Sequence, residues 1–95
     1  MKTRTSKNVF QDLGFQPEEA ANLRIRAALM ITLTEHLQRA DLTQKEAAKL
    51  LSVTQPRISD LMRGRIEVFS IDMLIAMLSR LGIKTSIRVG NKKVA

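Results

Sequence analysis

The chain has 95 residues, which is enough for one small domain with a single core. Sixteen Lys and Arg against nine Asp and Glu give a formal net charge of +7 at pH 7, and this charge points to a polyanionic partner. The sequence has no cysteine and one histidine, which excludes disulfides and a metal site built on cysteine or histidine within one chain. We therefore expect a protein that is not an enzyme and that uses no cofactor, no metal and no small-molecule substrate.

The two ends of the chain are polar and carry lysine. We expect flexible basic tails at residues 1–8 and 90–95, around a helical domain at 9–82 and a single strand at 83–89. The N-terminal tail is not followed by the apolar run that a signal peptide needs. The longest unbroken apolar stretch, Ala27–Ile31, is far shorter than the roughly 20 residues that span a bilayer. These features predict a cytoplasmic protein that does not enter a membrane.

The first and longest predicted helix runs from Pro17 to about Ala40. Proline suits the first helical position because its missing N–H is not needed there, and Glu18 and Glu19 suit the positive first turn. The apolar stripe of this helix has steps of three and four residues and comprises Leu23, Ala27, Met30, Ile31, Thr34 and Leu37. His36 lies beside the stripe, and we interpret it as a residue at the boundary of the core. Ahead of the helix, the sequence predicts a short turn or a one-turn helix that covers the core with Phe10, Leu13 and Phe15.

Three shorter helices are predicted after the first. The second begins with a Thr-x-x-Glu capping box at Thr43 and ends near Leu51. The third spans roughly Gln55–Arg63, and the fourth begins after the capping residue Ser70 and ends at Gly82. The excess positive charge lies in the second and third helices, with +3 over residues 43–65, and in the two tails.

Beyond Gly82 the apolar period changes to that of a strand. Apolar or β-branched side chains alternate with polar ones, and those on one face are Ile83, Thr85, Ile87 and Val89. A lone strand has no partner for its backbone groups in a helical chain. We therefore expect this strand to mediate dimerisation by pairing with its own copy in a second subunit.

Residues 43–64 predict a helix-turn-helix motif. Two short helices joined by a tight turn cross near a right angle if the residue at the crossing is small, and Ala48 meets this condition. The stretch resembles the lambda-repressor-like (Xre-type) helix-turn-helix family. The matching features are Leu-Thr-Gln at 42–44, Val-Thr-Gln at 53–55, Ile-Ser at 58–59 and Arg-Gly at 63–64. The resemblance implies an all-α bundle of four to five helices, with the C-terminal β-strand used in dimerisation.

Two residues depart from the pattern of this family. Ser52 stands in the turn where the family usually has glycine, at a place that tends to need a positive φ, and serine there costs about 1 kcal/mol. Pro56 lies in the first turn of the third helix, where its missing N–H does little harm. Because proline favours an extended backbone at Gln55, the helix begins at either Gln55 or Pro56.

The resemblance also implies how the motif contacts DNA. The N-terminal part of the third helix enters the major groove, where Gln55 pairs with adenine and Arg57 with guanine. Asp60 either orients Arg57 or accepts a hydrogen bond from cytosine, although the two residues could equally form an ordinary surface ion pair. The expected base contacts are Thr54, Gln55, Arg57, Ser59 and Asp60. The expected phosphate contacts, at the N-terminus of the second helix and after the third, are Thr43, Gln44, Lys45, Arg63 and Arg65.

A second set of matching features comprises Val-Phe-Gln-Asp-Leu-Gly at 9–14, Phe-Ser-Ile-Asp-Met-Leu at 69–74 and the final strand. With these features, residues 9–89 look like the HigA-like antitoxins, which are encoded beside a small toxin. This resemblance implies a sequence-specific DNA-binding repressor that acts as a homodimer on a near-palindromic operator, represses its own operon and neutralises a cognate toxin. Two alternatives remain open. One is a stand-alone Xre-type regulator without a toxin. The other, from a different class, is a toxin-neutralising protein-interaction module with no specific role on DNA.

Overall fold

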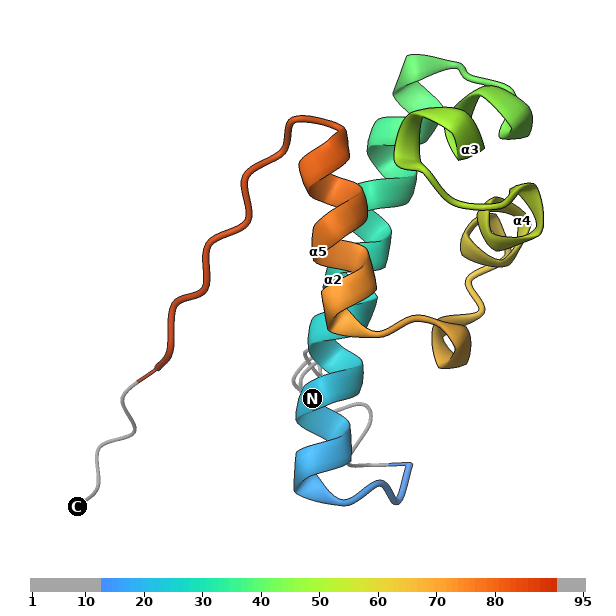
Figure 1. Cartoon of the computed structure of the whole chain (residues 1–95). Coiled ribbons are helices and arrows are strands. Elements are labelled where there is room, and N and C mark those ends of the chain that lie inside the picture. The colour runs from blue at the N-terminus through green and yellow to red at the C-terminus, as the bar shows by residue number, and fades with distance from the viewer. Residues whose placement is uncertain (1–12, 91–95) are drawn as a thin grey trace.

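The computed structural model describes residues 13–90, and this part of the chain is helical (Figure 1). The elements in chain order are α2 (Pro17–Ala40), α3 (Gln44–Leu51), α4 (Gln55–Met62), the 3-10 turn η1 (Ile66–Val68) and α5 (Ile71–Arg80). The predicted all-α class and all four predicted helices are confirmed. The expected tail at 1–8, Phe10 and the last residues of the C-terminal tail lie outside the described residues. No helix in the range 13–90 is long and apolar enough to cross a membrane.

Helix α2 is the long element on which the others pack. It begins at Pro17, and the backbone N–H of Gln16 donates to the carboxylate of Glu19 over 3.3 Å. It ends at Asp41, which has the left-handed conformation with a φ of 56°. Of the three side chains predicted to cover the core ahead of α2, the structure describes Leu13 and Phe15, and neither is buried, at 69% and 40% exposed.

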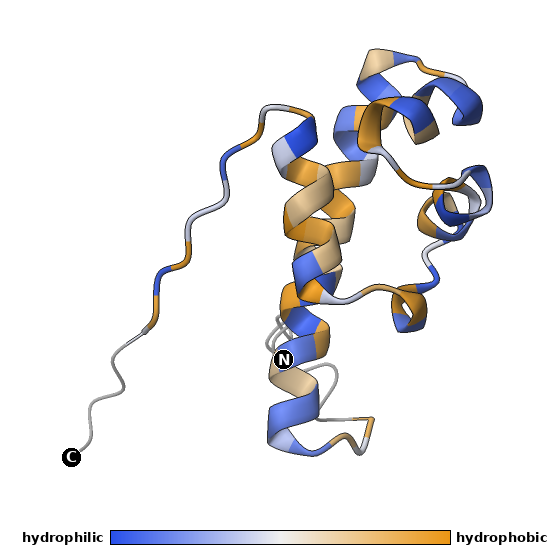
Figure 2. Ribbon diagram, viewed as in Figure 1, coloured by the Kyte–Doolittle hydropathy of each residue, from blue (hydrophilic) through white to orange (hydrophobic). Residues whose placement is uncertain are grey.

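The core lies where α5 packs along α2, where α3 packs against α4 and α5, and where α4 contacts α2. Figure 2 shows apolar residues along the line where α2 and α5 meet. The most deeply buried side chains are Leu33, Leu51, Ile58, Leu61, Leu74, Met77 and Leu78. The predicted stripe on α2 is correct at Met30 and Leu37 and wrong at Ile31, which is 57% exposed. The reason is that α5 and the motif contact the face of Met30, Leu33 and Leu37, and Ile31 points away from that face.

Helix α5 ends in a Schellman motif that directs the chain away from the bundle. Gly82 has a φ of +81°, its N–H donates to Ser79, and the N–H of Ile83 donates to Leu78 over 3.0 Å. Residues 83–90 then extend on the side of the α2–α5 pair opposite to α3 and α4 (Figure 1). The predicted β-strand at 83–89 is not seen. A strand needs a neighbouring backbone for its hydrogen bonds, and the described part of the chain offers none to this segment.

Candidate nucleic-acid interface

Helices α3 and α4 form a helix-turn-helix unit built on small buried residues. Ala47 and Ala48 are 3% and 8% exposed, so the helices approach closely at this point. Thr43 and Glu46 form the predicted capping box, with hydrogen bonds of 3.1 Å and 2.9 Å between side chains and backbone N–H groups. Helix α4 begins at Gln55, which decides between the two predicted starts, and Thr54 caps it by accepting from the N–H of Arg57.

The turn between α3 and α4 depends on a serine in a conformation that favours glycine. Ser52 has a φ of 57° and a ψ of 43°, as predicted from its position in the motif. The N–H of Val53 donates to Ala48 over 3.0 Å, and this hydrogen bond closes the turn. The left-handed conformation of Ser52 therefore ends α3 and lets the chain turn into α4.

The N-termini of α3 and α4 carry the exposed polar residues of the unit. The residues predicted as phosphate contacts at the start of α3 are all exposed, namely Thr43, Gln44 and Lys45. Thr54 and Gln55 are exposed at the start of α4, whereas Ser59 and Asp60 are half-buried one turn later. Backbone N–H groups and uncharged donors at two neighbouring helix N-termini suit the phosphates and base edges of a duplex.

Arg57 makes contacts that the sequence did not predict. Its Nη1 atom donates to the carbonyl of Val68 over 3.0 Å, and its guanidinium carbon lies 5.7 Å from the centre of the Phe69 ring. The side chain is half-buried and does not pair with Asp60. Of the alternatives considered for Asp60, a contact with Arg57 is not seen, because the guanidinium of Arg57 binds the carbonyl of Val68 instead.

Asp60 contacts two of the predicted phosphate-binding arginines instead. Its carboxylate lies 4.0 Å from Arg63 and 3.8 Å from Arg65, and the latter also pairs with Glu67 over 3.3 Å. A hydrogen bond from its own backbone N–H, with a smaller contribution from Arg65, lowers the pKa of Glu67. Arg63 and Arg65 remain exposed at 65% and 48%, so both are accessible to a phosphate.

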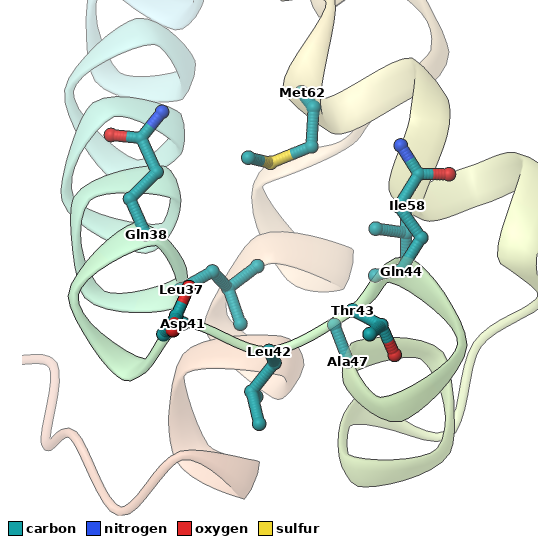
Figure 3. Close-up of a pocket in the computed structure, with 9 residues that line it drawn as sticks. All are labelled: Leu37, Gln38, Asp41, Leu42, Thr43, Gln44, Ala47, Ile58 and Met62. Atoms are coloured by element: carbon teal, nitrogen blue, oxygen red, sulfur yellow. The ribbon is translucent and has the colours of Figure 1, made fainter.

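A groove borders the N-terminus of α3. It lies between α2 on one side and α3 and α4 on the other, and Figure 3 shows Met62 reaching from α4 towards α2. Leu37, Ala47 and Ile58 contribute apolar lining, and Gln38 and Gln44 contribute polar groups. Within residues 13–90 there is no cluster of three or more histidine or acidic residues placed to hold a metal ion.

This arrangement defines a helix-turn-helix domain, the class of protein module that binds DNA through its second helix. A family model described as a helix-turn-helix domain matches residues 9–90, and the chain belongs to that family. The match covers α2, the motif, α5 and the C-terminal segment up to residue 90. Domains of this class are typical of DNA-binding regulators that are not enzymes. No curated protein matches the chain.

Two arginines that bind main-chain carbonyls of other elements were not predicted from the sequence. Arg26 on α2 donates from Nη1 to the carbonyls of Ile66 and Phe69, over 3.0 Å and 3.2 Å. Arg80 on α5 donates to the carbonyl of Leu51 over 3.3 Å at the end of α3. These contacts join residues that are 29 to 43 positions apart. A local pattern carries no signal for such pairs, because the acceptor is a main-chain atom.

Proposed function

We propose that the protein is a sequence-specific DNA-binding transcriptional repressor. The observation that carries this proposal is the pair of capped, exposed N-termini of α3 and α4, in a chain with a net charge of +7. Such a surface supplies donors to phosphates and base edges, and positive charge draws a duplex to it.

The proposed contacts follow from exposure and position. Thr54 and Gln55 reach base edges from the first turn of α4, with Ser59 and Asp60 contacting bases on the next turn. Thr43, Gln44 and Lys45 bind one phosphate group at the start of α3, and Arg63 and Arg65 bind the backbone beyond α4. Arg57, the remaining predicted base contact, would have to leave Val68 before it reached guanine.

We also propose that the repressor acts as a homodimer formed through residues 83–89. Ile87 and Val89 are 75% and 83% exposed, which is unusual for two apolar side chains that share a face. Between this segment and the helices lies a hollow to which Ile25, Leu29 and Ile75 contribute. A second copy would supply both the missing backbone partner and a cover for these side chains. Two motifs would then read half-sites about 34 Å apart on a near-palindromic operator.

The antitoxin role is a narrower form of the same proposal. Its support is the resemblance of residues 9–89 to HigA-like antitoxins. Inspection of the neighbouring gene and co-expression with its product separate the three readings. Rescue of growth together with operator binding supports an antitoxin. Operator binding without a toxic neighbour supports a stand-alone regulator, and rescue without operator binding supports a toxin-neutralising module.

The experiment that tests the DNA-binding proposal is selection from a random duplex library, followed by gel-shift titration of the selected sequence at several salt concentrations. We expect a near-palindromic sequence that binds at least about a thousandfold more tightly than random duplex. Equal affinity for selected and random DNA would overturn the proposal of a sequence-specific repressor.

A further inference from the structure

Arg57 joins the start of α4 to the segment that follows the helix. Its Nη1 atom donates to the main-chain carbonyl of Val68 over 3.0 Å. The same guanidinium lies over the ring of Phe69, which is only 2% exposed. The first of these groups belongs to the main chain, and the Phe69 ring belongs to the core. The side chain is therefore held at two points on the protein itself.

The segment that accepts Arg57 is also bound by α2. Arg26 on α2 donates to the carbonyls of Ile66 and Phe69. The short 3-10 turn η1 and the residue after it are thus bound by two arginines, one from α2 and one from α4. The turn therefore links α4 to α2, which is the longest helix of the described residues.

The direction of Arg57 on its helix separates it from the proposed base contacts. Ile58 and Leu61 are each 1% exposed and define the core face of α4. Each residue turns the helix by about 100°, so Arg57 lies on one flank of that face and Gln55 lies on the other. Gln55 is exposed, whereas Arg57 is half-buried against η1.

We propose that Arg57 is a positioning residue for α4, and that it fixes the orientation in which Gln55 meets the bases. This inference rests on the DNA-binding function proposed above. Helix α4 packs against α3 and α2 through the buried side chains of Ile58 and Leu61, and Arg57 adds a contact with η1 on the flank of that face. A bidentate amide–base pair tolerates little displacement, because hydrogen bonds weaken steeply as their distance and angle depart from the optimum. Release of the guanidinium from Val68 would therefore weaken every base contact of α4 together.

The test compares Arg57→Ala with the wild-type chain on the selected operator and on duplexes with each base pair replaced in turn. For Arg57→Ala we expect the ratio of operator to random affinity to fall about tenfold, the size of one mismatched base pair, with the preferences at all positions reduced in parallel. The slope of affinity against salt should not change, because no phosphate contact is lost.

Arg63→Ala is the matched control, because the same type of side chain is removed at the C-terminal end of the same helix. It should lower the salt slope by about one and leave the base preferences as they are. Arg57→Lys is the second variant of the tested residue, and it retains the charge without the planar fork. We expect it to show the same parallel loss as Arg57→Ala, to a smaller extent. Should Arg57→Ala fail to fold by circular dichroism, Arg57→Lys decides the test.

Three results would overturn the inference. Relaxation at a single base pair would make Arg57 a base contact, and a salt slope lowered by about one would make it a phosphate contact. A lower melting temperature with unchanged base preferences would make its role purely one of stability. If the wild-type chain selects no sequence, the proposed repressor function and this inference fail together. If it selects one and Arg57→Ala relaxes one position, only this inference fails.

Discussion

The arginines of this domain differ in what their guanidinium groups contact, and the total charge conceals the difference. Arg26, Arg57 and Arg80 donate to main-chain carbonyls of other elements. Arg63 and Arg65 are exposed and contact acidic side chains over 3.3–4.0 Å, and such surface ion pairs are weak. A polyanion would therefore meet the second group, and the first group would act through the shape of the domain.

Gln55 is the side chain on which we expect base discrimination to depend most directly. Gln55→Ala removes the amide that pairs with adenine, so preference at one base pair should fall by about 1–3 kcal/mol while the other positions keep theirs. Gel shifts on singly substituted operators measure this change. Gln44→Ala, at the exposed start of α3, serves as the control and should weaken all duplexes alike. Uniform loss of preference in Gln55→Ala would contradict the assignment.

Ser52 offers a test of backbone strain that is independent of DNA. Glycine adopts the left-handed conformation without the penalty of a Cβ atom, so Ser52→Gly should raise the free energy of unfolding by about 0.5–1 kcal/mol. Urea denaturation followed by circular dichroism measures the change. Ser70→Gly is the control of opposite sign, because Ser70 caps α5 from an extended backbone conformation. This variant should lower the free energy of unfolding by a few tenths of a kcal/mol. A destabilised Ser52→Gly protein would refute the strain.

Helices were predicted well because their signals are local. The capping box at Thr43, the cap at Ser70 and the glycine at 82 each lie within one turn of the helix end that they specify. The placement of Ile31 failed because two adjacent stripes on α2 satisfy the same spacing, and the packing of α5 decides between them. The prediction of a strand at 83–89 failed for another reason. Alternation of apolar and polar side chains indicates a strand, but a strand also needs a neighbouring backbone, and the described residues offer none to this segment.

The sequence predicted the helix-turn-helix motif of the candidate site, but not the contacts that join this motif to the rest of the domain. The motif residues at the starts of α3 and α4 are exposed, in keeping with their predicted use. The contact of Arg57 with Val68 was not predictable, because its acceptor is a carbonyl that every residue type carries. Whether Arg57 reads a base or supports the helix is thus decided by tertiary structure and not by its residue type.

The corrected face of α2 can be tested with a pair of neighbouring residues. Leu33 is fully buried and Ile31 is 57% exposed. Leu33→Ala leaves a cavity in the core and should cost about 2–5 kcal/mol of the free energy of unfolding. Ile31→Ala should change it by about 0.5 kcal/mol or less. Chemical denaturation measures both variants, and equal losses would show that the core has been assigned to the wrong face.

The whole domain has two sides with different chemistry. The helix-turn-helix unit lies on one side of the α2–α5 pair, and residues 83–90 extend on the other (Figure 1). The exposed apolar side chains of Ile87 and Val89 therefore lie away from the proposed DNA-binding surface. Two copies joined through these segments would leave both basic surfaces free to contact one duplex.

The dimer proposal predicts a change in mass. Truncation after Lys84 removes the exposed apolar residues but keeps Ile83, which packs against the core. We expect light scattering to give the mass of two chains for the full-length protein and of one chain for the truncated one. Ile87→Asp in the full-length chain should have the same effect, because it places a charge on the apolar face of the segment. A truncated protein that stays dimeric would assign the interface to the helices.

The main-chain acceptor at Val68 has a consequence for how such a domain could change its target. Every residue type presents the same carbonyl at position 68, so a substitution there that keeps the packing of the side chain against the core would leave the anchor of Arg57 intact. Position 55 lies in solvent and is free to vary without disturbing that anchor. A duplicated gene could then encode a protein that binds a different operator through a substitution at position 55 alone, while the contact of Arg57 with Val68 stays the same.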